Sequence, residues 1–196
     1  MIQNSGRIAL STAVAMLAAA ASAQATIINY SAFLDGPSES PPNASPATGQ
    51  AFVDIDTVLH TMRVQVSFTG LLGPTTASHI HAATALPGVG TAGVATQTPT
   101  FTGFPTGVTS GVYDHTFDMT LASSYNASFV TANGGTAASA EAALFGAIAA
   151  GKAYVNVHTT AFGGGEIRGF LTPVPAPGAA SVLALGGLFA VRRRRA

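Results

Sequence analysis

The stretch Ser78-His79-Ile80-His81-Ala82 places two histidines two residues apart around a β-branched residue. In a strand, alternate side chains point to the same face, so His79 and His81 would leave one face together while Ile80 enters the other. The rise along a strand separates the roots of the two side chains by roughly 6–7 Å. That spacing allows two imidazoles to tilt onto one metal ion or one ligand.

A second stretch far along the chain has the same alternation. In Tyr154-Val155-Asn156-Val157-His158-Thr159, the side chains of Tyr154, Asn156 and His158 share one face, and the two valines occupy the other. We expect this strand to lie beside the first, so that the three histidines of the two strands face one pocket.

Three neutral imidazoles suit copper or zinc, so His79, His81 and His158 are the candidate metal ligands. An open fourth position on the ion would permit catalysis, and a filled one would be structural. A metal-bound imidazole normally passes its second N–H to a carbonyl or carboxylate. Among nearby side chains, we expect Asn156 and Glu166 to take that supporting role.

The same residues also have a purely structural interpretation. His79 and His81 would then be partly buried and hydrogen-bonded, without a ligand. Glu166 and Arg168 would form an ordinary pair on one face of a later strand. The spacing of the residues leaves both interpretations open.

Composition limits the possible functions. The chain has 196 residues, eight of them basic and eight acidic, and no cysteine. Four basic residues form the run 192–195 and a fifth is Arg7, so the middle carries three basic residues against eight acidic ones, a net charge of −5. Such a body lacks the clustered Lys and Arg that phosphate binding needs, which argues against a nucleic-acid partner. Without cysteine there is no disulfide and no thiolate metal site.

The hydrophobic pattern predicts an all-β fold. Only the alanine-rich segment 137–150, which stops at Gly151, is typical of a helix. The proline-rich segment 35–48 excludes both helix and central strand. We therefore expect one antiparallel β-sandwich or barrel with a single crossover helix. Strands are predicted at 26–33, 49–56, 59–71, 78–82, 112–121, 152–160 and 166–172.

Both ends of the chain differ from this body. Residues 1–25 have the basic start, short apolar run and small residues of a secretory signal peptide, although a buried helix would also fit the run. Residues 173–196 combine prolines, the apolar run 178–191 and four arginines, which is the order of a stop-transfer signal. The run is short against the ~20 residues of a spanning helix, so a transient span that is later processed fits better than a permanent anchor.

Several blocks of the body carry a family resemblance: Phe33-Leu34-Asp35-Gly36, Thr48-Gly49-Gln50-Ala51, Gly70-Leu71, His79-Ile80-His81, Gly151-Lys152-Ala153-Tyr154-Val155-Asn156-Val157-His158-Thr159 and Gly165-Glu166-Ile167-Arg168-Gly169. Together they make residues 26–172 resemble a CHRD domain, a module first noticed in chordin and found in many microbial proteins. The resemblance implies an immunoglobulin-like or superoxide-dismutase-like β-barrel. Together with the two terminal segments, it leads us to expect an exported module of the cell surface or extracellular matrix. We expect a non-enzymatic role for this module, and the histidines add a candidate copper or zinc site.

The tail carries a second resemblance. Val174-Pro175-Ala176-Pro177, the apolar run and the terminal arginines are similar to a PEP-CTERM sorting signal, with Ala176 where that motif usually has Glu. Such tails occur on exported proteins of Gram-negative bacteria that make exopolysaccharide. The resemblance implies the Sec export machinery and an exosortase as partners, and a transient passage of the tail through the membrane.

A fainter resemblance links the body to copper–zinc superoxide dismutases, which take copper ligands from a His-x-His strand and from a later strand. His79, His81 and His158 would hold copper, and Arg168 would be the arginine beside the metal. The chain lacks the cysteine pair and the zinc-ligand loop of those enzymes. Despite these differences, a copper-dependent dismutase-like enzyme is one alternative. A ligand-binding or adhesive domain with an extracellular protein or polysaccharide partner is another.

Overall fold

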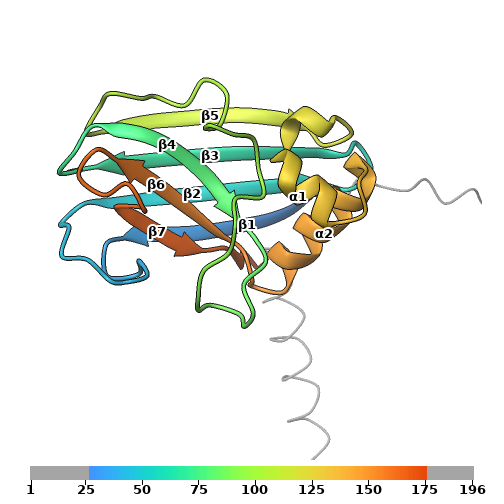
Figure 1. Cartoon of the computed structure of the whole chain (residues 1–196), viewed down its shortest axis with the longest axis horizontal. Coiled ribbons are helices and arrows are strands. Elements are labelled where there is room, and N and C mark those ends of the chain that lie inside the picture. The colour runs from blue at the N-terminus through green and yellow to red at the C-terminus, as the bar shows by residue number, and fades with distance from the viewer. Residues whose placement is uncertain (1–26, 176–196) are drawn as a thin grey trace, which may run out of the picture.

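A single eight-stranded sheet organises residues 27–175, which are the part of the chain that the computed structural model describes (Figure 1). The predicted signal peptide, residues 1–25, and residues 176–196 of the predicted tail lie outside the described residues. The strands are β1 (Ile27–Asp35), β2 (Thr48–Asp56), β3 (Thr61–Thr69), β4 (Thr75–His81), β5 (Gly111–Asp118), β6 (Tyr154–Thr159), β7 (Ile167–Phe170) and β8 (Thr172–Pro173).

The sheet is antiparallel throughout and curves into a half-barrel. Its strand order is β4-β6-β7-β1-β2-β3-β5, and β8 pairs separately with β1. The expected all-β fold is thus confirmed. The order also brings β4 and β6 together as neighbours, although more than seventy residues separate them in the sequence.

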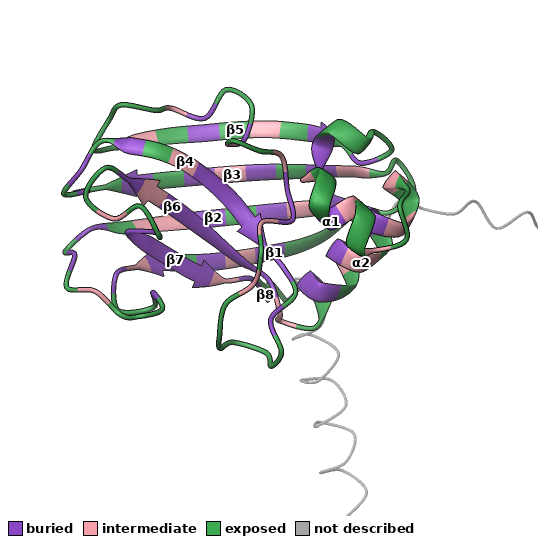
Figure 2. Cartoon of the chain, in the orientation of Figure 1, coloured by how far each residue is buried: buried purple, intermediate pink, exposed green. Residues whose placement is uncertain are grey.

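Alternation of the side chains decides which face of each strand is buried (Figure 2). In β3, Met62, Val64 and Val66 are buried, while the intervening Arg63 is exposed. In the same way β6 sends Val155 and Val157 into the core. Since side chains of a strand point alternately to its two faces, one hydrophobic face of the curved sheet builds the core.

The helices lie together at one end of the half-barrel (Figure 1). The predicted helix is present as α2 (Ala137–Ala149), with a reciprocal capping box between Thr136 and Ser139 at its start. Two short helical segments were not predicted: η1 (Ala122–Ser124) and α1 (Ala127–Ala132). They are too short to show a helical period in the sequence. Within residues 27–175, no helix is both long and apolar enough to cross a membrane.

A long irregular segment, residues 82–110, connects β4 to β5 and runs along the free edge of β4. Its backbone N–H groups at Ala95 and Phe101 donate to the carbonyl oxygens of Ile80 and Ser78, at 2.9 and 3.1 Å. An open sheet edge needs such cover, because its unpaired backbone groups would otherwise pair with other chains. This segment also lies over the histidines of β4.

Candidate metal centre

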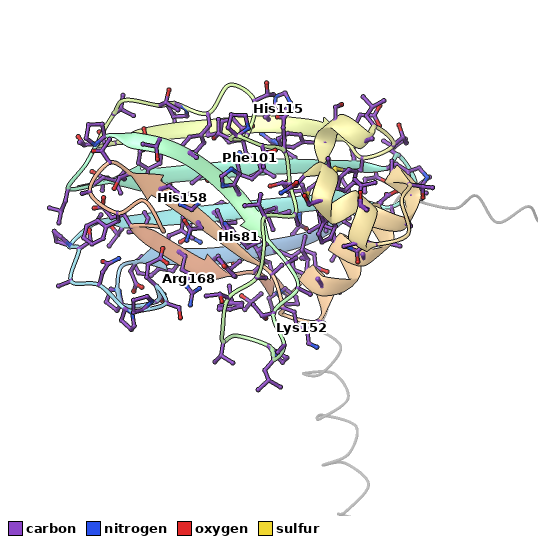
Figure 3. The ribbon with its side chains drawn as sticks, viewed as in Figure 1. His81, Phe101, His115, Lys152, His158 and Arg168 are labelled. Carbon is purple, nitrogen blue, oxygen red and sulfur yellow. The ribbon has the colours of Figure 1, made fainter. Side chains whose placement is uncertain are left out.

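The pairing of β4 with β6 aligns the two histidine stretches. His79 lies opposite Asn156, His81 opposite Tyr154, and His158 opposite Ala77. Neighbouring side chains on both strands, such as the fully buried Ile80, point into the barrel core. By this register the three histidines occupy the other face of these strands, and Figure 3 labels His81 and His158 among them.

On that face the three imidazoles form one cluster. One nitrogen from each of His79, His81 and His158 lies within 4.8 Å of the other two. The ring centroids are 5.2 Å apart for His79 and His158, and 5.8 Å apart for His81 and either of the others. His79 and His81 are buried and His158 is partly buried, so loops cover a site that would otherwise face water.

Three backbone carbonyls fix which nitrogen of each ring faces the cluster. Nε2 of His79 lies 2.7 Å from the oxygen of Pro99 and Nδ1 of His81 lies 2.9 Å from the oxygen of Ala92. Nδ1 of His158 lies 3.0 Å from the oxygen of Gly163. A carbonyl oxygen only accepts hydrogen bonds, so each of these nitrogens donates an N–H. In a neutral ring, the remaining nitrogen then carries a free lone pair.

Those lone pairs point at one another instead of at donors. Nδ1 of His79 is 3.3 Å from Nε2 of His158, and Nε2 of His81 is fully buried without a hydrogen-bond partner. A buried polar atom without a partner costs free energy, and natural structures rarely leave one. A cation among the three nitrogens would satisfy all three lone pairs at once. Their residue types and geometry therefore fit copper or zinc.

Burial also keeps the three candidate ligands in their neutral form. It lowers the pKa of His79 from 6.5 to about 4, although the bond to Pro99 opposes the shift. Burial lowers the pKa of His81 to about 4 as well, and the charge of Arg168 is among the smaller contributions. The pKa of His158 is lowered for the same principal reason. Neutral imidazoles are the form that binds a metal, so no proton competes with an ion at neutral pH.

The two side chains expected to support the ligands make their hydrogen bonds elsewhere. Asn156 donates from Nδ2 to Oε1 of Glu39 at 3.0 Å, and its own Oδ1 is buried without a partner. Glu166 accepts from Ser45, Leu72, Gly73 and Thr159. In place of these two side chains, the backbone carbonyls described above accept from the imidazoles. No residue pattern in the sequence identifies a carbonyl in an irregular loop, so these three contacts could not be anticipated.

Arg168 is buried on the strand next to β6. Its Nη1 donates to the oxygen of Gly90 at 3.1 Å and its Nε donates to the oxygen of Ser38. Its guanidinium carbon lies 4.7 Å from the centre of the Tyr154 ring, which in turn stacks on His81 with centroids 4.8 Å apart and planes 5° from parallel. A positive charge is thus held over an aromatic ring that contacts a candidate ligand.

Glu39 is the acidic group nearest to this arginine. Its Oε2 lies 3.8 Å from Nε of Arg168, and both side chains are about 5% exposed. Burial raises the pKa of Glu39 to about 7, although Arg168 lowers it. The proline-rich segment 35–48 therefore brings an acid to the site, a contact that its composition alone did not predict.

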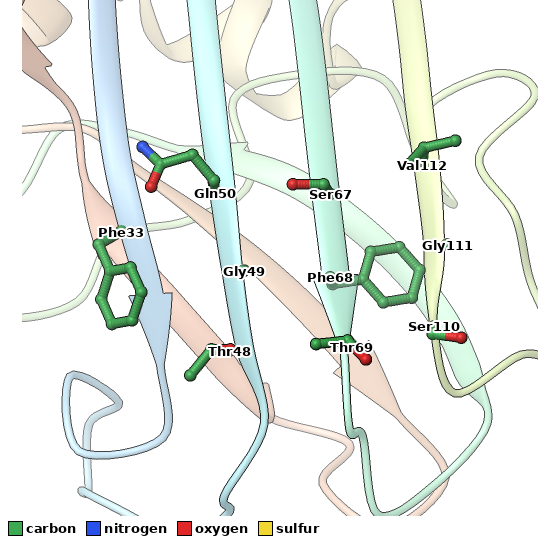
Figure 4. A pocket seen from close by; sticks show the side chains of 10 residues that line it. All are labelled: Phe33, Thr48, Gly49, Gln50, Ser67, Phe68, Thr69, Ser110, Gly111 and Val112. Atoms are coloured by element: carbon green, nitrogen blue, oxygen red, sulfur yellow. The ribbon is translucent and has the colours of Figure 1, made fainter.

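One surface groove lies away from the three clustered histidines. It has a volume of about 570 Å³ and crosses the ends of β1, β2, β3 and β5 (Figure 4). Its lining is uncharged and includes Phe33, Gln50, Ser67 and Val112. None of the predicted site residues belongs to it.

Of the predicted sorting motif, Val174 and Pro175 directly follow β8, whereas Ala176 and Pro177 lie outside the described residues.

The fold and the histidine cluster define a half-barrel module with a candidate metal site. Comparison with known protein families matches residues 30–171 to the CHRD domain, so the chain belongs to the CHRD family. Neither the curated proteins nor the solved structures contain a match to this chain. Membership of this family points to an extracellular module.

Proposed function

We propose that this protein is an exported CHRD module that holds one copper or zinc ion through His79, His81 and His158. The observation that carries the proposal is the buried, unpartnered Nε2 of His81, which faces the free nitrogens of the other two rings. Carbonyl acceptors on the far side of each ring hold the free nitrogens in position, as is typical of metal-binding histidines. Residues 1–25 would direct export through the Sec machinery, and residues 173–196 would be the substrate of an exosortase.

A binding role fits these residues better than the dismutase-like alternative. In that alternative, Arg168 would attract superoxide from solvent. Its guanidinium is instead buried, bonded to two carbonyls and stacked on Tyr154. The site therefore resembles a closed ion-binding site more than an open catalytic one.

Metal analysis of the purified protein tests this proposal. We expect one copper or zinc ion per chain in the wild type, and at least 100-fold weaker binding in His81→Phe. The matched control is His115→Phe, because His115 packs against Phe117 on β5, 4.7 Å between centroids, outside the cluster. The electron paramagnetic resonance spectrum of added Cu²⁺ should show coupling to three imidazole nitrogens. No bound metal, or equal binding in the two variants, would refute the proposal.

A further inference from the structure

The groups that accept hydrogen bonds from the three candidate ligands are all neutral. All three imidazoles donate to neutral carbonyls at Pro99, Ala92 and Gly163. Zinc-binding histidines commonly donate to a carboxylate, which makes the ligand more basic and offsets the charge of a dication. Among the described residues, the candidate cluster contains no acidic ligand. An ion in this site would thus keep most of its charge uncompensated.

A fixed positive charge lies close to the same site. Because β4 and β7 flank β6, Arg168 and His81 approach Tyr154 from opposite sides. Glu39 does not form a close ion pair with this arginine, because its Oε2 lies 3.8 Å from Nε of Arg168 and its Oε1 accepts from Asn156. Asp35, the cross-strand neighbour of Arg168, accepts from the backbone N–H of Ser38 at 2.8 Å. In a buried site, a nearby cation destabilises a divalent ion about twice as strongly as a monovalent one.

The number of ligands points in the same direction. Structural zinc sites almost always have four protein ligands, and catalytic sites with three add a water as the fourth, whereas this cluster offers three ligands, of which His79 and His81 are buried. Monovalent copper accepts three nitrogen ligands and carries half the charge. From the ligand count, the neutral acceptors and the buried arginine together, we infer that the site is selective for Cu⁺ over Zn²⁺ and Cu²⁺. This inference rests on the proposed metal site and assigns the ion and its oxidation state.

Competition titrations of the purified protein test the selectivity. A colorimetric cuprous chelator under anaerobic conditions measures the affinity for Cu⁺, and a zinc-sensitive dye measures that for Zn²⁺. We expect Cu⁺ to bind at least 100-fold more tightly than Zn²⁺. In Arg168→Met, which removes the charge but keeps a long side chain, the ratio should fall at least tenfold. Arg168→Lys keeps the charge and should keep the ratio.

The Cu²⁺/Cu⁺ reduction potential of the bound copper gives a second measurement. It would not change in the Arg168 variants if Arg168 had a purely structural role. A tenfold loss of preference for Cu⁺ over Cu²⁺ corresponds to a potential about 59 mV lower. Glu39→Gln removes the nearby acid and should raise the potential. Binding of Zn²⁺ as tight as that of Cu⁺, or a potential unchanged in both variants, would overturn the selectivity while leaving the metal site intact. Failure of every ion to bind would overturn the site itself.

Discussion

Nδ1 of His79 lies 3.3 Å from Nε2 of His158, and the N–H on the other nitrogen of each ring donates a hydrogen bond to a backbone carbonyl. Two neutral rings in these tautomers bring two lone pairs face to face, with the unpartnered Nε2 of His81 beside them. The metal-free fold therefore carries a local electrostatic cost. Such a cost is expected where a site is built for an ion rather than for maximal stability.

Replacing one of the three histidines by an apolar ring of similar shape should remove part of that cost. We expect His81→Phe to leave the metal-free free energy of unfolding at pH 7.5 within about 1 kcal/mol of the wild type, or to raise it. The new ring would keep its stack on Tyr154, and Ala92 would still accept from the Tyr154 hydroxyl at 3.4 Å. Denaturant titration measures this. His81→Ala is the contrast, because its cavity should cost about 2 kcal/mol or more. Equal losses in both variants would show that His81 is held for a structural hydrogen bond.

The stability of the metal-free protein should depend on pH through the same rings. His79 and His81 have a pKa of about 4 in the fold, against 6.5 when exposed. Below pH 6.5 the two histidines bind protons in the unfolded chain but not in the folded one. Their contribution to the free energy of unfolding is therefore fully present above pH 6.5 and falls as the pH drops toward 4. Between pH 6.5 and 5 we expect these two rings to contribute a loss of about 2–4 kcal/mol. Glu39 offsets part of this loss, because its pKa of about 7 in the fold makes the folded chain take up a proton over the same range.

Denaturant titrations at pH 7.5, 6.0 and 5.0 in the presence of a chelator measure this loss. His81→Phe removes one of the three rings whose pKa is lowered, so its loss over the same pH range should be clearly smaller than that of the wild type. A pH profile identical in wild type and variant would contradict the assignment of a lowered pKa to His81.

Glu166 should act as a structural carboxylate instead of a metal-supporting one. It accepts from Oγ of Ser45 at 2.6 Å, from N of Leu72 at 2.6 Å and from Oγ1 of Thr159 at 2.7 Å. Glu166→Gln would turn an N–H donor toward these donors, so we expect a loss of roughly 2–4 kcal/mol in unfolding free energy. Metal affinity per folded molecule should stay unchanged. Asp114→Asn, which breaks an exposed pair with Arg63, should leave stability nearly unchanged.

The same carboxylate sets a second pH dependence. Burial pushes the pKa of Glu166 up, but its hydrogen bonds outweigh burial and leave the pKa below 4.5. Its contribution is therefore present above pH 4.5 and is lost as the pH falls through the lowered value. In Glu166→Gln the acid limb of the stability curve should be flatter than in wild type. An equally steep limb would mean that other groups control acid unfolding.

The sequence predicts the strands far better than the contacts of the loops. Alternation identified β4 and β6 and the shared face of His79, His81 and His158, because a strand repeats every two residues regardless of its neighbours. It could not predict that Glu166 would be satisfied by Ser45, more than a hundred residues away. Irregular loops have no period, and their partners are set by the completed fold. The clustering of the three histidines was therefore predictable, but their hydrogen-bond acceptors were not.

Two glycines provide the sharpest test of how the strands around the site are packed. A Cβ on Gly169 would collide with the carbonyl oxygen of Phe33 and lie 2.9 Å from its carbonyl carbon, so β1 and β7 could not keep their approach. We expect Gly169→Ala to cost about 3 kcal/mol or more, or to prevent folding. A Cβ on Gly163 meets nothing within 4 Å. Gly163 accepts a hydrogen bond from His158 through its backbone carbonyl oxygen, which alanine would also provide.

Gly163→Ala should therefore fold with wild-type stability, within about 0.5 kcal/mol, and keep its metal. Thermal unfolding and metal titration of the two variants measure these effects side by side. If Gly169→Ala were as stable as Gly163→Ala, β7 could not lie as close to β1 as described, and the position of Arg168 would have to be revised. If Gly163→Ala folded but lost its metal, the loop after His158 would contribute more to the site than one carbonyl oxygen.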